Sequence, residues 1–404
     1  MRVLVAGLSV RAAAESAARA GFEVTAVDAF SDLDQHAAVR CLAPVQPFSA
    51  RAAARAARGV RCDAAVYLAN FENDPEAVEE LAAGRTLWGN SAAVLRRVRD
   101  PRLLKQALEQ RGIATPALRF GPEAGKRGRE SFPIVSQAKK TPDPFPPPRR
   151  WLVKPLRSGG GHDVRPWRPG TAVPPGCHLQ EVVDGTPVSA AFVAAGGRAT
   201  LLGLCRILVG DGAFGAEGFR YCGNILAPVG DRSGSDDEAL RSAAGDVAAA
   251  LAEAFGLVGV NGVDFVAHGG VAHPIEVNPR WSGSMELIER AYGLSIFAAH
   301  AAACAKGSLP SLDLARAGRC AGAVGKAVVF ARRDLTVGDT SRWLGDESVR
   351  DVPRPGERIA AGRPICTVFA AGPDAAACRD GLVHRAERVY AALAPPGDTA
   401  GEVL

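Results

Sequence analysis

The sequence lacks a continuous apolar segment of the roughly 20 residues that a membrane-spanning helix needs. Its opening residues, MRVLVAGLSV, lack the separate charged region, long apolar region and cleavage site of a secretory signal peptide, so we expect a strand there. It also lacks a strongly basic stripe with interleaved aromatic residues, and its formal net charge is only +5 over 404 residues. These absences predict a cytoplasmic protein that binds neither a membrane nor nucleic acid.

The nine cysteines are scattered, and none forms a Cys-x-x-Cys pair or joins a histidine cluster at metal-binding spacing. We therefore expect reduced, mostly buried thiols rather than a disulfide framework. What the chain does contain is the composition of an ordinary globular protein, with 47% apolar and 23% charged residues. This length is enough for two or three domains.

The first part of the chain carries the pattern that opens a doubly wound parallel sheet. An apolar run at residues 2–7 ends in glycine, an alanine-rich helix follows, and a second strand at 23–27 ends at Asp28. The turn after the first strand lacks the full G-x-G-x-x-G fingerprint, so we favour a structural or substrate-binding role for Asp28 over dinucleotide binding. A third strand at 64–68 leads to Glu72 and Asn73, which are candidates for binding a substrate amine or for capping the next helix.

The stretch NGVDFVAHGGVAHPIEVNPRWSGS, residues 261–284, predicts a β-hairpin that turns at two adjacent glycines. With the turn centred near Gly270, Asp264 falls opposite Glu276, and strand alternation places Asn278 on the same face as Glu276. Two opposed carboxylates repel one another unless a cation lies between them, and this oxygen set suits Mg²⁺. The alternative is a surface hairpin with solvated acids, but Asn-Pro-Arg followed by Ser-Gly-Ser is an unusual continuation for one.

A second candidate site begins at the strand 151–155, which delivers Lys154 inward and is followed by Ser158, Gly159, Gly160 and Gly161. The glycines expose backbone N–H groups that can close over phosphate oxygens, and lysine is a suitable partner for the same oxygens. The spacing differs from the Walker pattern, and no helix directly follows the glycines. A glycine-rich hairpin tip without a ligand is the alternative.

Several other segments gain meaning only from their order along the chain. The helix around residues 101–111 contains Lys105, residues 121–150 resemble a linker, and residues 178–189 form two strands joined by a short acidic turn. Residues 210–223 are a glycine-rich segment that could cover a site, and a long amphipathic helix follows at 237–255.

Taken in this order, the segments resemble the ATP-grasp superfamily over roughly residues 1–330. The resemblance implies an α/β and α+β chain with a Rossmann-like first domain, a two-subdomain ATP-grasp fold and a small β-rich appendage. The boundaries that we expect are 1–95 for the Rossmann-like domain, 96–180 for the small lid subdomain with its linker, 181–325 for the large subdomain with the metal site, and 326–404 for the appendage.

The resemblance also implies roles for individual residues. ATP would be held by Lys105, Lys154, Ser158, Gly159, Gly160, Gly161, Gln180, Glu181, Val182, Val183 and Asp184. Mg²⁺, with Mn²⁺ as a substitute, would be held by Asp264, Glu276 and Asn278. The catalytic residues would be Lys154 and Arg280, and the substrates would lie against Glu72, Asn73, Arg280, Ser282, Gly283 and Ser284.

Within that superfamily, the FEND segment at 71–74, the segment EVNPRWSGSMELIERAYG at 276–293 and the β-rich tail look similar to ATP-dependent carboligases. That branch includes tyramine-glutamate ligases of methanofuran-type cofactor biosynthesis. The implied reaction joins glutamate to tyrosine or tyramine, so the partners are a small-molecule carboxylate and amine. The resemblance leaves open whether the chain forms a homodimer. The alternatives are another ATP-grasp amino-acid ligase or carboxylase, a nucleotide-binding regulatory protein without turnover, and a Rossmann oxidoreductase indicated only by Gly7 and Asp28.

Overall fold

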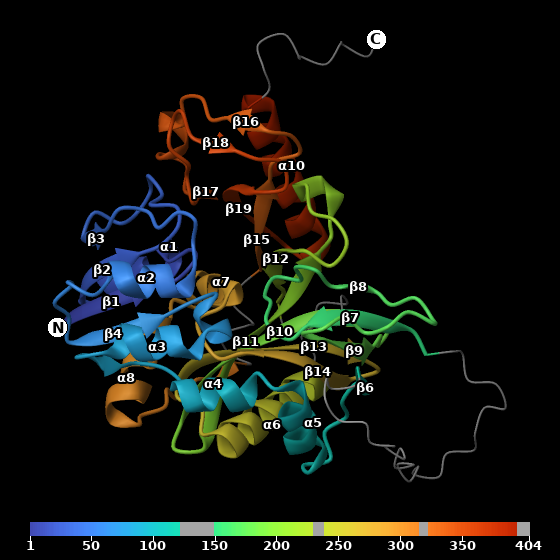
Figure 1. Ribbon diagram of the computed structural model, residues 1–404. Coiled ribbons are helices and arrows are strands. Elements are labelled where there is room, and N and C mark those ends of the chain that lie inside the picture. Colours follow the sequence, from blue (N-terminus) through green and yellow to red (C-terminus); the bar gives the residue numbers. More distant parts are fainter. Residues whose placement is uncertain (122–148, 229–237, 315–321, 394–404) are drawn as a thin grey trace, which may run out of the picture.

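The computed structural model describes residues 1–121, 149–228, 238–314 and 322–393, which are arranged around four β-sheets (Figure 1). The N-terminal sheet lies on the left in Figure 1, the large central sheet in the middle, the lid sheet on the right and the C-terminal elements at the top. Within the described part of the chain, no helix is both long and apolar enough to span a membrane. No disulfide joins the cysteines of these ranges.

The N-terminal sheet has five parallel strands in the order β3-β2-β1-β4-β5, which confirms the predicted parallel opening. The central strands β1 and β4 are buried along almost their whole length, as expected for apolar runs covered on both faces. The strands are β1 (Arg2–Ala6), β2 (Glu23–Val27), β3 (Val39–Cys41), β4 (Ala64–Tyr67) and β5 (Thr86–Leu87). The helices of this region are α1 (Arg11–Arg19), α2 (Ala50–Ala56), η1 (Phe71–Asn73), α3 (Pro75–Ala82), α4 (Ala92–Val98) and α5 (Pro101–Glu109).

Helix α3 is capped by Asp74, whose side chain accepts a hydrogen bond from the Ala77 N–H, with Pro75 in the first turn. The expectation that Glu72 or Asn73 caps this helix is therefore wrong. Both residues belong instead to the short helix η1, which places them ahead of the cap and leaves their side chains available for other contacts.

The lid sheet consists of four antiparallel strands in the order β6-β9-β7-β8. Most of the predicted linker at 121–150 lies outside the described residues. The strands are β6 (Leu118–Phe120), β7 (Trp151–Pro155), β8 (Arg165–Pro166) and β9 (Cys177–Glu181).

The central sheet has eight strands in the order β14-β13-β10-β11-β12-β15-β19-β17. Alternate residues of β10 pack into two different cores. Phe192 packs with α6 on one face of the sheet, and Val193 packs with α7 and α8 on the other. The strands are β10 (Thr186–Ala195), β11 (Arg198–Val209), β12 (Tyr221–Leu226), β13 (Gly259–His268), β14 (Val271–Asn278), β15 (Ala323–Phe330), β17 (Val349–Arg350) and β19 (Pro364–Gly372). The helices are η2 (Gly212–Phe214), α6 (Glu238–Phe255), α7 (Gly283–Tyr292) and α8 (Ile296–Lys306).

The N-terminal and central sheets share a core. Val3 and Val5 of β1 belong to the same buried cluster as Val193 of β10, and Met285 and Phe297 of the intervening helices lie within it. The carboxyl ends of the parallel strands are therefore held in a fixed position beside the central sheet.

The C-terminal elements extend the central sheet rather than forming a sheet of their own, because β15 pairs with β12 and then with β19. Only β16 (Leu335–Thr336) and β18 (Arg358–Ile359) form a separate two-stranded sheet. The remaining elements are η3 (Ser341–Trp343) and α10 (Ala375–Ala392). The residues expected in the appendage are thus β-rich, while the domain boundaries stay predictions.

His300 on α8 ties that helix to the central sheet. It is 3% exposed, and its Nδ1 accepts a hydrogen bond from the Val260 N–H at 3.0 Å. Burial lowers the pKa of His300 from 6.5 to about 4, so the ring is neutral in the folded protein.

We expect the free energy of unfolding to fall as the pH drops from about 6.5 to about 4, because the unfolded chain gains a proton at His300 that the folded chain does not bind. The full effect is about 3 kcal/mol. Urea denaturation of His300→Asn, which keeps an acceptor near the Val260 N–H but cannot titrate, should show a smaller loss over that range. An equal loss in both proteins would assign the acid sensitivity elsewhere.

Candidate functional site

The hairpin formed by β13 and β14 has the predicted register, with Asp264 directly opposite Glu276 and Gly262 opposite Asn278. The chain reverses at Gly269 and Gly270, whose φ angles of +56° and +76° are accessible to glycine without strain. Asn278 donates from Nδ2 to Asp264 Oδ2 at 2.9 Å, so the two acids and the amide lie together. The prediction made from strand alternation is confirmed.

The electrostatics of the pair favour a cation. Burial, and then the charge of Glu276, raise the pKa of Asp264 to about 6. Burial acts to raise the pKa of Glu276 as well, but the positive charges of Arg99 and Lys154 outweigh it and leave that pKa lowered. Within the described residues no group of three His, Cys, Asp or Glu side chains is placed to hold a metal ion. Two carboxylates and an amide fit Mg²⁺ only where a ligand such as phosphate, or water, supplies the remaining oxygens.

Arg99, which follows α4, is a site residue that sequence reasoning missed. It donates from Nη1 to Glu276 Oε1 at 2.7 Å, and from Nη2 to the Ser158 carbonyl at 2.9 Å and to Asn73 Oδ1 at 3.2 Å. Its Nε is buried without a hydrogen-bond partner. Arg99 therefore contacts the hairpin, the glycine-rich loop at residues 158–161 and the N-terminal domain. The only sequence signal was a run of arginines in an arginine-rich chain, which is not informative.

Lys154 of β7 projects from the lid sheet toward the hairpin. Its Nζ donates to the Ile275 carbonyl at 3.2 Å and to Gln180 Oε1 at 3.0 Å, and burial lowers its pKa. His178 pairs directly with Lys154 across the strands and stacks on Phe120, with ring centroids 5.6 Å apart. The His178 Nδ1 has no hydrogen-bond partner, although it is buried. A polar face of the lid sheet thus meets the acidic pair of the hairpin.

The glycine-rich loop is docked against the segment at 210–223, which the sequence indicated as a cover for the site. The Tyr221 N–H donates to the Gly160 carbonyl at 3.0 Å. Gly161 has a φ of +73°, and a Cβ added there would lie 1.8 Å from the Phe219 carbonyl oxygen. Only glycine allows this approach.

Arg280, two residues beyond the hairpin, is paired with Glu72 from the N-terminal domain. Its Nε donates to Glu72 Oε1 at 2.7 Å and its Nη2 to Asn278 Oδ1 at 3.1 Å. The side chains of Glu72 and Arg280 are only 1% and 11% exposed. The second carboxylate oxygen of Glu72 has no hydrogen-bond partner. The structure thus brings together two predicted substrate residues that are 208 positions apart.

Arg280→Met should cost about 3 kcal/mol or more of unfolding free energy, because it leaves the Glu72 carboxylate buried without its cation. Adding Glu72→Gln should restore most of that loss, since the uncompensated charge is then removed. Chemical denaturation of both single variants and the double variant measures this coupling. Strictly additive losses would show that the pair is not energetically linked.

The predicted substrate residues Ser282, Gly283 and Ser284 lie at the start of α7, and the two serine hydroxyls are 3.0 Å apart. A Cβ at Gly283 would lie 2.5 Å from the Tyr221 hydroxyl, so this turn faces the segment on which the glycine-rich loop is docked. Their role in holding a substrate stays a prediction.

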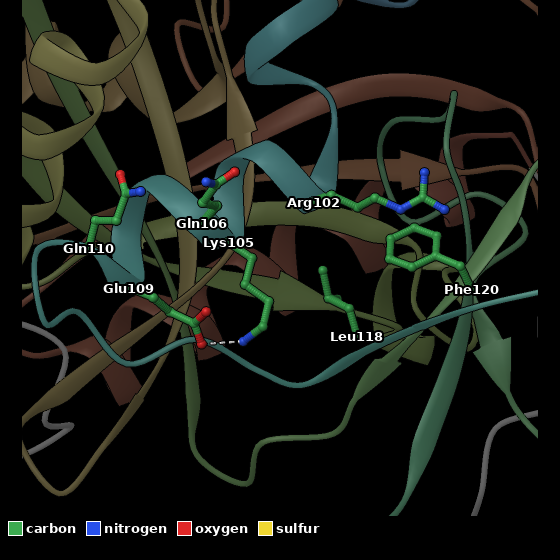
Figure 2. Close-up of a pocket in the computed structure, with 7 residues that line it drawn as sticks. All are labelled: Arg102, Lys105, Gln106, Glu109, Gln110, Leu118 and Phe120. Carbon is green, nitrogen blue, oxygen red and sulfur yellow. Dashed lines mark hydrogen bonds and ion pairs between the residues drawn. The ribbon is translucent and has the colours of Figure 1, made fainter. Parts of the chain in front are cut away.

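The remaining predicted ATP ligands have contacts of their own. Lys105 pairs with Glu109 and donates to Thr115 Oγ1 at 2.9 Å. It lines an open pocket of about 480 Å³ between α5 and β6, in which Arg102 lies over the Phe120 ring at 3.8 Å (Figure 2). Whether Lys105 contacts phosphate from this position stays a prediction.

The expected adenine and ribose connector follows β9. Glu181 Oε2 accepts a hydrogen bond from the Ala117 N–H at 3.1 Å, and the Val182 N–H donates to the Arg150 carbonyl at 2.9 Å. Asp184 is exposed and pairs with Arg150. The roles of Gln180, Val183 and their neighbours in nucleotide binding stay predictions.

Comparison with known proteins identifies the architecture. Residues 98–284 match the sequence profile of a family described as the ATP-grasp domain. The chain has an ATP-grasp fold. The matched residues run from α4 through the lid sheet to the start of α7, so they contain the hairpin of β13 and β14 and also Lys154. The predicted fold class is confirmed.

Solved structures resemble the ATP-grasp chain over nearly its whole length. An L-amino acid ligase from Bacillus licheniformis has a TM-score of 0.64 at 16% identity, with 96% of this chain and 97% of that one covered. N5-carboxyaminoimidazole ribonucleotide synthetase from Thermus thermophilus has a TM-score of 0.62 at 19% identity, with 98% and 99% covered. The biotin carboxylase domain of Hydrogenobacter thermophilus 2-oxoglutarate carboxylase, solved with MgADP and bicarbonate, has a TM-score of 0.62 at 15% identity, with 92% and 86% covered. No curated protein sequence matches the chain.

Proposed function

We propose that the protein is an ATP-dependent ligase that activates a carboxylate as an acylphosphate and joins it to an amine. The observation that carries the proposal is the meeting of Lys154 on the lid sheet with the Asp264 and Glu276 hairpin, beside Arg280. Both cations and the two acids converge from separate elements, which suits a substrate that carries several phosphate oxygens and one metal ion.

In the proposed first step, a carboxylate oxygen of the substrate attacks the γ-phosphorus of ATP, and the bond to the bridging oxygen of ADP breaks. Lys154 and Arg280 stabilise the negative charge that spreads over the phosphoryl and carboxylate oxygens. Asp264, Glu276 and Asn278 would hold Mg²⁺, or Mn²⁺, which supplies further positive charge at the phosphates when bound.

In the second step, the amine nitrogen attacks the acyl carbon and phosphate leaves, while the proton lost by the nitrogen passes to phosphate or solvent. No protein nucleophile takes part in this scheme. Because water would hydrolyse the acylphosphate, the docking of the Gly160 carbonyl on the Tyr221 N–H supports a covering role for the glycine-rich loop.

The substrates that we propose are glutamate as the carboxylate and tyrosine or tyramine as the amine, in methanofuran-type cofactor biosynthesis. This assignment rests on the resemblance of the segments at 71–74 and 276–293 to that carboligase branch. The competing candidates are another amino-acid ligase and a carboxylase, which the likeness to the Bacillus licheniformis and Hydrogenobacter thermophilus structures favours equally.

The test is an assay of purified protein with Mg²⁺, ATP, glutamate and a panel of amines that includes tyrosine and tyramine. We expect ADP and phosphate, together with a product lighter than the summed substrates by one water in mass spectrometry. Release of AMP in place of ADP would contradict the acylphosphate scheme. ADP formation with other substrates only would keep the ligase chemistry and overturn the substrate assignment.

A further inference from the structure

The buried side-chain nitrogen and oxygen atoms without a hydrogen-bond partner fall at two places in the described residues. Three of them, on Glu72, Arg99 and His178, belong to the site described above. The other two are Asp32 Oδ2 and Gln35 Nε2, on the turn that follows β2. A buried carboxylate oxygen without a donor is costly, so its presence points to a ligand that supplies one.

This turn is bound firmly to the C-terminal part of the chain. The Leu33 N–H donates to the Val352 carbonyl at 2.9 Å, and the Asp34 carboxylate accepts from the N–H groups of Asp351 at 3.1 Å and Val352 at 2.9 Å. Asp32 itself is 9% exposed. The turn is thus fixed in place, and its orphaned oxygen is not the result of a loose surface loop.

The neighbourhood of Asp32 carries an excess of negative charge. Burial raises the pKa of Asp32 well above its usual range, and the charges of Asp351, Asp28 and Asp34 raise it further. Arg11 is a buried cation that acts on Asp32, but its guanidinium also contacts the carboxylates of Asp351, Glu286, Glu15 and Asp34 at 2.7 to 3.6 Å. Of these acids, Glu15 pairs with Arg19 as well, and Glu286 with Arg290. Lys326 pairs with Glu286, and Arg354 donates to the Ser31 carbonyl.

We propose that Asp32 binds the ammonium group of an amine or amino-acid substrate, at a site formed by the turn after β2 and by Asp351. An ammonium group offers three N–H donors and a positive charge, which meets both the orphaned oxygen and the charge excess. A divalent metal ion is the alternative ligand for the orphaned oxygen, and the test below distinguishes the two. Glu72, the earlier candidate for this role, is already neutralised by Arg280.

The position of the turn suits a substrate of the proposed ligase, on which this inference rests. Asp28 follows β2 and Glu72 follows β4, and only β1 lies between these two strands. With a strand spacing of about 4.8 Å, the two strand ends are roughly 10 Å apart at the same edge of the sheet. Ligands of doubly wound sheets bind at that edge. The turn that carries Asp32 therefore begins at the same sheet edge as Glu72, the partner of Arg280.

The test compares the thermal stability of the full-length protein in 1,4-diaminobutane and in tetramethylammonium chloride at matched ionic strength, since only the first has N–H donors. We expect 1,4-diaminobutane to raise the Tm of the wild type and of Asp380→Asn, an exposed control on α10. In Asp32→Asn the half-saturating concentration should rise roughly tenfold or more, the usual effect of losing a hydrogen bond to a charged group. Asp32→Ser provides a second variant if Asp32→Asn does not fold.

An equal response in Asp32→Asn, an equal response to tetramethylammonium, or no response in the wild type would overturn the ammonium site. Stabilisation by MgCl₂ that depends on Asp32, without any effect of the amine, would replace it with a divalent-cation site. MgADP is titrated in the same assay to separate the two proposals. Failure of MgADP to bind would overturn the ligase, whereas an amine response that ignores Asp32 would overturn only this inference.

Discussion

Glu276→Gln is expected to lower ATP-dependent turnover by roughly 100- to 1,000-fold, the range seen when one preorganised charge-stabilising group is removed from an active site. The substitution keeps the shape of the side chain but removes one of the two charges that attract the metal ion. The glutamine oxygen can still accept from Arg99, which is also held by Ser158 and Asn73. The measurement is steady-state ADP release over a range of Mg²⁺ concentrations.

Glu276→Gln should still fold, because the change removes the repulsion with Asp264 across the strands as well as the ion pair with Arg99. Glu79→Gln is a suitable control, since Glu79 is an exposed acid paired with the exposed Arg96 at 3.2 Å, and this variant should turn over at the wild-type rate. Unchanged turnover in Glu276→Gln, with the control also unchanged, would refute the metal assignment of the hairpin.

Gly161→Ala should reduce turnover by about 100-fold, because the glycine-rich loop can no longer dock on the segment at 210–223. A Cβ at Gly161 would lie 1.8 Å from the Phe219 carbonyl oxygen, and backbone atoms there cannot move aside cheaply. The positive φ of +73° adds a local cost of roughly 1–2 kcal/mol for any residue with a Cβ. The loop should therefore release from its docked position while the sheets stay folded.

Gly245→Ala, on α6, provides the control for Gly161→Ala. Its φ lies outside the left-handed region, and a Cβ added there has no neighbour within 4 Å from outside its own helix in the described part of the chain. We expect near-normal turnover from it and a nearly unchanged Tm from both variants. Equal activity of the two variants would contradict the proposal that the glycine-rich loop covers the site.

Much of the fold could be predicted from local sequence patterns. Strand β2 has the predicted limits at Glu23 and Val27, because the apolar run is bounded by Gly21-Phe22 and Asp28. The pairing of Asp264 with Glu276 could also be predicted, since a tight turn at Gly269 and Gly270 leaves little freedom of register. These features depend on residues that are close in sequence.

Contacts between distant segments could not be predicted in the same way. The pair between Glu72 and Arg280 depends on how the N-terminal and central sheets share a core, and no local pattern encodes that arrangement. Arg99 was hidden among other arginines, and its role appears only when the glycine-rich loop and Glu276 are placed beside it. The pairing of β12 with β15 likewise joins segments about a hundred residues apart.

The central claim is that a nucleotide and Mg²⁺ bind between Lys154 of the lid sheet and the acidic hairpin. Isothermal titration of the full chain with ADP, with and without Mg²⁺, tests it most directly in the wild type and in Lys154→Met. We predict one site per chain that depends on Mg²⁺, with an affinity reduced by roughly tenfold or more in Lys154→Met, as expected for losing a charged contact to phosphate. Absence of binding, or binding that is indifferent to both Mg²⁺ and Lys154, would contradict the account.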